Sequence, residues 1–418
     1  MCAFGDGDGS GPSEPSGRMH DGPSMPSYDG SGSHDHEFEE LYGEPIAKAL
    51  DLSTWQTGVN LEELYTRIDD EQVAAALRFE AGMKPAIREH LFAQIPKRPQ
   101  APPDAGVYQA TREQIERTHK GLLFTGGVEA VDGTFFTFDT MPLTVNQIGV
   151  CTVSYRGDQG TYVHRLYRRD LRAGTPDDLD TLLSLLEKRM RRSAVGVSDE
   201  QDALTQLATV GLMSYAERAI LLRRCTAPWR MGHGNPAPFE LLTGSGSMEL
   251  LEHSLSLLKE LLVEHETWVF VTSSPKDRVL LTIGQALNPL EYAIIETSRD
   301  KMNSIVEHHR YDPYHTRLVR EFVDGVAPHV VRGVYKASGM SPPYIFYAHA
   351  KRAHDAALIA LADSTMHEHR GFPMLLDLAD LICKGTFGAQ ALATQMEVTF
   401  AAQGVPFEYL PERHTRRT

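Results

Sequence analysis

The sequence predicts an α/β protein with a mixed sheet, and two patterns support this prediction. Three strand-like runs follow one another at 127–138, 145–156 and 161–169, and their short connections indicate an antiparallel meander. Downstream, apolar runs over Phe239–Leu242 and Trp268–Ser273 enclose a helical pattern over Ser247–Glu264. Strands that alternate with helices in this way are typical of parallel crossover units.

Further elements continue this order toward the C-terminus. Ser198–Gln201 resembles a capping box, and it opens a helical segment that runs to about Arg224. The remaining predicted elements are strands at 330–337 and 344–348 and helices at 351–363, 374–383 and 385–402. Three antiparallel strands followed by strand–helix alternation is the order of an RNase H-like fold. We expect this fold over residues 121–418.

The N-terminal part of the chain differs from this core in composition. Residues 1–37 are rich in Gly, Ser, Pro, Asp and His, so we expect a disordered acidic tail. Over residues 38–120 the apolar spacing is helical, with a Pro-rich break at Ile95–Pro103. The predicted helices are Phe38–Leu50, Asn60–Ala81 and Arg112–His119. We interpret residues 38–120 as a helical extension for dimerisation or partner binding.

Charge and composition limit the classes of function. The net charge is −15, of which residues 1–40 supply −8 through nine acidic residues and one arginine, leaving −7. Nucleic-acid binders are usually basic, so a DNA substrate would need a partner that delivers it. The four cysteines lack CxxC spacing, and we find neither a signal segment nor an apolar run of ~18–20 residues. We therefore expect a cytoplasmic protein without a membrane span.

The run Val128–Phe136 delivers one carboxylate, Asp132, to a predicted glycine turn at Gly133 between two strand-like runs. A carboxylate in a core is costly unless it is paired or binds a metal. Many metal-dependent phosphodiester hydrolases begin with an aspartate on the first central strand. For the tripeptide alone, an ordinary Asp-Gly turn between two strands is the favoured interpretation.

Phosphoryl transfer with two metal ions requires several carboxylates that converge on one point. Glu217 is a candidate because it interrupts a helix beside Met213 and Leu221, although a surface ion pair with Arg218 or Arg224 is an alternative. Asp377 and Asp380 lie three apart on a predicted helix, which places them on one face.

A further acidic candidate lies in the segment Pro238–Gly246, which we predict to be a short strand ending in a glycine-rich turn. Sites in open α/β sheets gather at the carboxyl ends of the strands, so Glu240 in this segment could join them. The chain contains no Walker sequence, and we do not expect it to hydrolyse ATP itself.

Together these segments resemble the NurA family of DNA-end-processing nucleases over roughly residues 120–415. The resemblance rests on Val-Asp132-Gly-Thr, Ala216-Glu217-Arg, Phe239–Gly246 and Phe372-Pro-x-Leu-x-x-x-Ala-Asp380. Members of this family have an RNase H-like core, form dimers, use manganese or magnesium and work with the hexameric HerA DNA-pumping ATPase. The resemblance implies metal ligation by Asp132 and Glu217.

Two positions depart from the family pattern. Thr243 stands where an acid followed by Gly and a small residue is usual. Glu240 could substitute only with a local bulge, because an odd offset on a strand points to the opposite face. The terminal motif usually has an aromatic residue and, eight positions on, a histidine, and here these are Phe372 and Asp380. An aspartate can replace histidine as a ligand for a hard metal ion.

The expected function is that of a divalent-metal-dependent deoxyribonuclease, an exonuclease or endonuclease, that acts on DNA ends with a HerA-type ATPase in DNA repair or anti-phage defence. Asp132, Glu217 and Asp380 would hold one or two Mn²⁺ or Mg²⁺ ions, and Glu240 would be a further catalytic carboxylate. Arg218 and Lys384 would contact phosphate oxygens of the substrate.

Two alternatives remain open at this level. One is a catalytically degenerate NurA-like scaffold that dimerises and regulates a DNA-translocating motor, which Thr243 favours. The other is a single-subunit RNase H-like enzyme that acts on RNA or hybrids, because the residues identified contact metal and phosphate rather than the sugar.

Overall fold

The computed structural model describes residues 33–55, 73–139, 143–157, 159–168, 203–274 and 277–405, with isolated positions at 62, 65, 66, 68 and 183. The chain divides into two compact units, Met1–Arg78 and Phe79–Thr418. This boundary lies well before the expected one at 120/121. The predicted capping box over Ser198–Gln201 and the predicted tail up to residue 32 lie outside the described residues.

The described part of the first unit is helical, and much of the helix expected over Asn60–Ala81 lies outside the described residues. Its elements are α1 (Ser33–Tyr42), α2 (Ile46–Leu50), η1 (Leu52–Thr54) and the start of α4 (Ala74–Ala86). Gly43 adopts a φ of 73° directly after α1, a conformation that favours glycine and ends the helix. The predicted helix Phe38–Leu50 is therefore two helices, and the expected tail ends at α1 rather than at residue 37.

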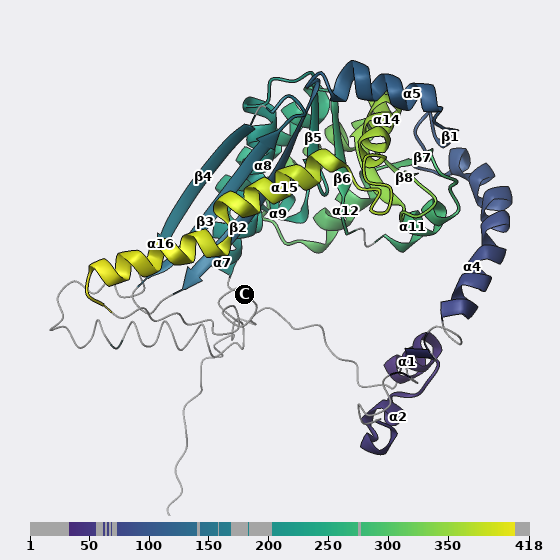
Figure 1. The fold of residues 1–418 in the computed structure, drawn as a ribbon, viewed down its shortest axis with the longest axis horizontal. Coiled ribbons are helices and arrows are strands. Elements are labelled where there is room, and N and C mark those ends of the chain that lie inside the picture. The colour runs from purple at the N-terminus through teal and green to yellow at the C-terminus, as the bar shows by residue number, and fades with distance from the viewer. Residues whose placement is uncertain are drawn as a thin grey trace, which may run out of the picture. The chain divides into compact units, whose positions relative to one another are not determined.

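Among the described residues of the second unit, nine strands form one sheet in the order β1-β7-β8-β9-β6-β5-β2-β3-β4 (Figure 1). The strands are β1 (Gly106–Gln109), β2 (Val128–Asp139), β3 (Thr144–Val153), β4 (Gln159–Arg168), β5 (Trp229–His233), β6 (Trp268–Thr272), β7 (Glu291–Thr297), β8 (Val330–Lys336) and β9 (Tyr344–His349). The expected meander is confirmed, since β2, β3 and β4 pair antiparallel. Strands β2, β5 and β6 are mutually parallel, so the sheet is mixed as predicted.

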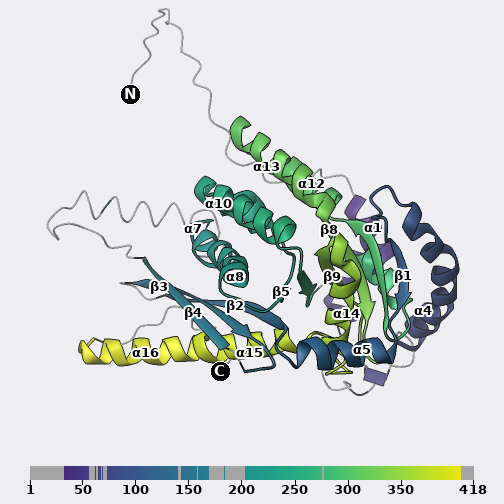
Figure 2. The same ribbon diagram turned by 90° about the horizontal axis from the view of Figure 1, so that it is seen from above.

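Helices cover both faces of this sheet (Figure 2). One face packs against α5 (Arg112–Thr118), α14 (Ala353–Ser364) and α15 (Met374–Phe387), around a core that includes Leu361, Leu375 and Phe346. The other packs against α8 (Leu212–Arg223), α10 (Met248–Lys259), α12 (Arg299–His308) and α13 (Pro313–Val326). Every residue of β3 is buried, because helices lie over both of its faces.

Other helical elements, most of them short, complete the described residues of this unit. They are η4 (Ile87–Leu91), η5 (Phe92–Lys97), η6 (His119–Leu123), α7 (Ala203–Gln206), η8 (Leu207–Gly211), α9 (Phe239–Thr243), η9 (Gly244–Gly246), η10 (Glu260–Glu264), α11 (Arg278–Gln285), η11 (Ala327–His329), η12 (Ala350–Arg352) and α16 (Ala389–Ala402). No helix among the described residues is long and apolar enough to cross a membrane.

Two sequence predictions near the candidate site are wrong. Phe239–Leu242 is not a strand but most of helix α9, which starts after Pro238 and ends at Gly244 with a φ of 63°. A run this short, with three apolar residues and one glutamate, fits a helix as well as a strand. Gly133 is not in a turn either, because β2 continues through it and pairs it with Val150.

Candidate active site

Asp132 lies where strand β2 separates from its parallel neighbour. Strand β5 pairs with β2 only from Val128 to Val131, and Asp132 is the next residue. Its side chain is buried, with 4% of the residue exposed. Since residues on a strand alternate between faces, Asp132 points to the face covered by α15, as Ala130 does. The carboxylate therefore lies inside the molecule, at the carboxyl end of the parallel strands.

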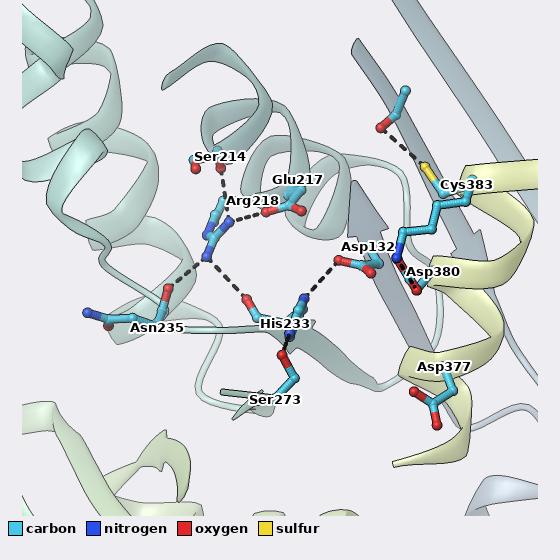
Figure 3. Close-up of polar contacts among 12 residues, drawn as sticks. Asp132, Ser214, Glu217, Arg218, His233, Asn235, Ser273, Asp377, Asp380 and Cys383 are labelled. Carbon is cyan, nitrogen blue, oxygen red and sulfur yellow. Dashed lines mark hydrogen bonds and ion pairs between the residues drawn. The ribbon is translucent and has the colours of Figure 1, made fainter. Parts of the chain in front are cut away.

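His233, the last residue of β5, fixes this carboxylate. Its Nδ1 lies 3.1 Å from Asp132 Oδ1, and its Nε2 lies 2.7 Å from Oγ of Ser273, just beyond the end of β6. Burial alone would lower the pKa of His233, but the hydrogen bond and the negative charge of Asp132 outweigh it and raise the pKa. The ends of three parallel strands are thus joined through one imidazole ring (Figure 3).

Glu217 reaches the same strand from the opposite side. It lies on α8, which packs on β2, and 9% of the residue is exposed. A Cβ atom added to Gly133 would lie 2.7 Å from Glu217 Oε1 and 3.0 Å from Cγ of Met213. Glycine at 133 is therefore what lets α8 bring Glu217 against the backbone next to Asp132.

Arg218 links helix α8 to the segment that follows strand β5. It is 3% exposed and forms an ion pair with Glu217. It also donates hydrogen bonds to four backbone carbonyls, among them those of Asn235 at 2.7 Å and Ser214 at 3.3 Å. These bonds tie α8 to the segment that follows β5. The predicted contact of Arg218 with substrate phosphate stays a prediction, since its donors are already engaged inside the protein.

The two carboxylates influence each other electrostatically. Burial raises the pKa of Glu217 to about 7, and the charge of Asp132 acts in the same direction. Arg218 acts against them, together with His233 and the backbone of Gly133. A cation bound beside Glu217 would favour the charged form of this carboxylate.

Helix α15 brings the terminal motif to the same place. The ring of Phe372, just before α15, contacts the ring of His233 edge-on with centroids 5.9 Å apart. Figure 3 shows Asp377 and Asp380 on α15, on the side of Asp132 away from Glu217. Asp377 pairs with Arg370 at 2.8 Å, and Asp380 pairs with Lys384 at 2.8 Å.

The Asp380–Lys384 pair is open to solvent, with 38% and 64% of the two side chains exposed. Lys384 also lines a groove of about 720 Å³ together with Thr134 and Phe136 of β2. Lys384 is therefore accessible to a ligand, in contrast to Arg218.

The start of α15 is anchored by a buried acid that sequence reasoning did not identify. Asp363, at the end of α14, accepts hydrogen bonds from the backbone N–H of Leu375 at 2.9 Å and the hydroxyl of Tyr155 at 2.5 Å. Burial raises the pKa of Asp363 to about 6, although both donors act against this shift. This carboxylate fixes the beginning of the helix that carries Asp377 and Asp380.

Glu240 and Thr243 are placed differently from the prediction. Both belong to helix α9, so the strand bulge that a ligand role for Glu240 required is not present there. Thr243 is buried and donates from Oγ1 to the carbonyl of Phe239 at 2.8 Å, a bond within the helix. Within the described part of the chain, the hydrogen bonds and ion pairs of Asp132, Glu217 and His233 reach neither residue.

His233 is the site residue that the sequence reasoning missed. The tripeptide His233-Gly234-Asn235 begins at the end of the strand that pairs with β2 up to Val131, which places His233 beside Asp132. The sequence did contain a signal for His233, because Gly234 and Asn235 follow it directly after a short strand-like run downstream of Glu217. Arg230 obscured it, because a buried arginine interrupts the apolar pattern of β5.

The fit of a divalent cation can be judged from these donors. Among the described residues, no three His, Cys, Asp or Glu side chains form a ready metal-binding group. Nevertheless, Asp132 and Glu217 are buried on either side of Gly133, a contact that a Cβ would block. Each is paired with a cationic or cation-forming side chain, His233 or Arg218. Hard oxygen donors of this kind suit Mn²⁺ or Mg²⁺.

Comparison with solved structures gives NurA nucleases and endonuclease V. The NurA nuclease from Sulfolobus solfataricus is 8% identical, with 84% of this chain and 99% of that chain covered and a TM-score of 0.44. A NurA structure with dAMP and manganese is 9% identical over 75% and 92%, with a TM-score of 0.33. The catalytic domain of human endonuclease V is 12% identical over 79% and 99%, with a TM-score of 0.27.

No protein-family model matches the sequence, and comparison with curated proteins finds no match. The resemblance expected from the sequence is confirmed as a structural similarity at 8–12% identity. The RNase H-like assignment stays a prediction. The chain is thus similar in structure to the NurA nucleases.

Proposed function

We propose that this protein is a divalent-metal-dependent deoxyribonuclease with an RNase H-like core. The observation that carries the proposal is that two buried carboxylates lie close together: Asp132 at the carboxyl ends of parallel strands and Glu217 against the adjacent Gly133. Such edges are where sites form in α/β sheets. Arg218 and His233 pair with these acids in the structure, and a divalent cation bound between the acids would add to this compensation.

Asp132 and Glu217 would hold the cation, and Asp380 would complete the site from α15. A bound Mn²⁺ or Mg²⁺ ion would supply Lewis-acid stabilisation of the phosphodiester and lower the pKa of the attacking water. His233 orients Asp132 by bridging it to Ser273. Lys384, which is exposed beside Asp380, would neutralise a phosphate of the incoming strand.

Delivery of the DNA is assigned to a partner. The chain carries a net charge of −15, which opposes unaided capture of a polyanion. We propose that a HerA-type hexameric ATPase feeds DNA ends to a homodimer of this chain, in repair or anti-phage defence.

Degradation of linear DNA with Mn²⁺, measured with and without the ATPase, tests the proposal. Asp132→Asn is expected to reduce the rate by more than about 100-fold. Loss of a residue that only supports a metal ligand costs up to about 100-fold, and loss of a ligand itself should cost more. EDTA should abolish the reaction. Asp324→Asn serves as the control, since Asp324 is exposed and lies on α13. Degradation that persists unchanged in Asp132→Asn would overturn the proposal.

A catalytically degenerate scaffold is the second candidate. Its support is that the described residues contain no ready group of three metal-binding side chains. The same assay separates the two, because a scaffold leaves DNA intact with Mn²⁺ whether or not the motor is present. An RNA or hybrid substrate in parallel reactions tests the remaining sugar preference.

A further inference from the structure

A second pocket, with polar and apolar walls, lies on the face of the sheet that α8 and α12 cover. It has a volume of about 420 Å³, within the size range of pockets that hold small ligands. Asn235 lines it, and the backbone carbonyl of the same residue accepts a hydrogen bond from Arg218. The pocket is therefore connected to the Glu217–Arg218 pair through a single residue.

The start of helix α12 supplies the polar end of this pocket. Ser298 precedes the ten-residue helix, and its Oγ is buried without a hydrogen-bond partner among the described residues. The residue is 3% exposed and borders the pocket. Lys301, in the first turn, borders it too. A helix N-terminus with a free hydroxyl and an ammonium group forms a typical set of donors for a phosphate.

Ion pairs surround this end of the pocket, and Asp300 in the first turn of α12 adds one further negative charge. Arg332 is 2% exposed and pairs with Asp277 at 2.6 Å and Glu296 at 2.8 Å. Lys301 lies 3.4 Å from Asp277, and Arg98 lies 3.4 Å from Glu296. Three cationic side chains thus face two carboxylates. The carboxylate of Asp277 is nearest to the pocket, and Arg332 and Lys301 compensate its charge.

The remaining wall is aromatic and apolar. Tyr347 lines it, with the guanidinium of Arg332 5.9 Å from the centre of its ring. Met302 and Ile305 of α12 add aliphatic surface. A planar ring fits such a wall, because aromatic faces stack with nucleobases.

We infer that this pocket binds one nucleotide of the strand, with its phosphate at Ser298 and Lys301 and its base against Tyr347. The inference rests on the proposed function, since a nucleic-acid strand in the active site would bring a nucleotide to Asn235. It assigns Lys301 and Ser298 to substrate positioning rather than to the chemical step.

Binding of dAMP in EDTA, measured by calorimetry, tests this inference apart from cleavage. Lys301→Ala and Ser298→Ala should each weaken dAMP binding about tenfold, the value of one charge-assisted hydrogen bond. Lys351→Ala is the matched control, since Lys351 is an exposed lysine paired with Glu266. Inorganic phosphate and deoxyadenosine should each bind more weakly than dAMP.

Phosphate that binds as tightly as dAMP would overturn the assignment of a nucleotide. Equal dAMP binding by wild type and Lys301→Ala, with both proteins folded, would overturn the site itself. If the wild type binds no dAMP but degrades DNA in an Asp132-dependent way, the pocket inference fails while the proposed function stands. If dAMP binds as expected but Asp132→Asn leaves degradation unchanged, the proposed function fails instead.

Discussion

The two helices that flank β2 at Asp132 carry their charged residues in opposite ways. On α8, Glu217 and Arg218 are 9% and 3% exposed, and Arg218 is bonded to four carbonyls as well as to Glu217. On α15, the Asp380 and Lys384 side chains are 38% and 64% exposed, and each has the other as its ion-pair partner. The α8 side is therefore built into the fold, whereas the α15 side can rearrange when a ligand arrives.

This difference teaches how such a site can be both preorganised and accessible. A buried ion pair with complete hydrogen bonding keeps its geometry, because removing either partner leaves an unpaired charge. A solvent-exposed pair contributes little and can be exchanged for a phosphate or a metal ion. Four substitutions test whether the two helices differ as described.

The largest effect is expected for Arg218→Ala. The change removes a buried ion pair and leaves backbone carbonyls without their donor, so the free energy of unfolding should fall by about 3–5 kcal/mol. Arg223→Ala is the control, since Arg223 is an exposed arginine of the same helix, paired with Glu260. Urea denaturation followed by circular dichroism measures both. If Arg218→Ala were as stable as Arg223→Ala, the buried Arg218 would not stabilise the fold as described.

Asp363 is expected to make stability depend on pH. Its pKa is raised from 3.8 to about 6 in the folded protein, so the folded state binds a proton more tightly than the unfolded state. The stabilising effect of the proton is complete below pH 3.8 and is lost as the pH rises to about 6, in total roughly 2–3 kcal/mol at 1.36 kcal/mol per pKa unit.

Comparison with Asp363→Asn isolates this contribution from other groups that titrate in the same range. The difference in unfolding free energy between the two proteins should change between pH 4 and 6 and be constant above it. A difference that does not vary with pH would mean that Asp363 is not a proton-binding anchor of α15.

Gly133→Ala tests the close contact of α8 with β2. The added methyl group would meet Glu217 Oε1 at 2.7 Å, and overpacking of this kind costs about 1–3 kcal/mol. We expect lower stability and weaker Mn²⁺ binding. Gly325→Ala is the matched control, because Gly325 lies in α13 with open space around it. If the two variants were equally stable and bound Mn²⁺ equally well, the close contact with Glu217 would not explain the glycine at 133.

The smallest effect on stability is expected for Lys384→Ala. An exposed ion pair contributes no more than about 1 kcal/mol, so the variant should unfold at nearly the wild-type denaturant concentration. Its DNA affinity should fall, and the dependence of binding on salt should weaken by about one phosphate contact. A large loss of stability would place Lys384 in the structural core and contradict the comparison of the two helices.

Much of the fold was accessible from the sequence, because long runs of Val, Phe and Thr define β2 and β3, and spaced leucines define α10. The errors include the short elements β5 and α9, and strand β7 and helix α13 were not predicted. Strand β5 contains Arg230, whose guanidinium donates to the carbonyls of Leu221, Cys225 and Ala227, and a buried arginine is invisible to an apolar pattern. The run Phe239–Leu242 carries no information on whether it is a helix or a strand.

For the site, Asp132 and Glu217 were identified from their positions, and the structure brings both to Gly133. The partners of these residues were not, because His233 and Asp363 depend on contacts between distant parts of the chain. Burial of Arg218 likewise follows from carbonyls of the segment after β5. Such contacts arise only when the sheet is assembled.

The most direct test of the central claim is the location of bound manganese. A crystal structure with Mn²⁺, with the ion identified by its anomalous signal, should place an ion in contact with the carboxylates of both Asp132 and Glu217. In Asp132→Asn crystals grown under the same conditions this signal should be lost. An ion bound elsewhere, or none at all in a protein that degrades DNA with Mn²⁺, would contradict the account.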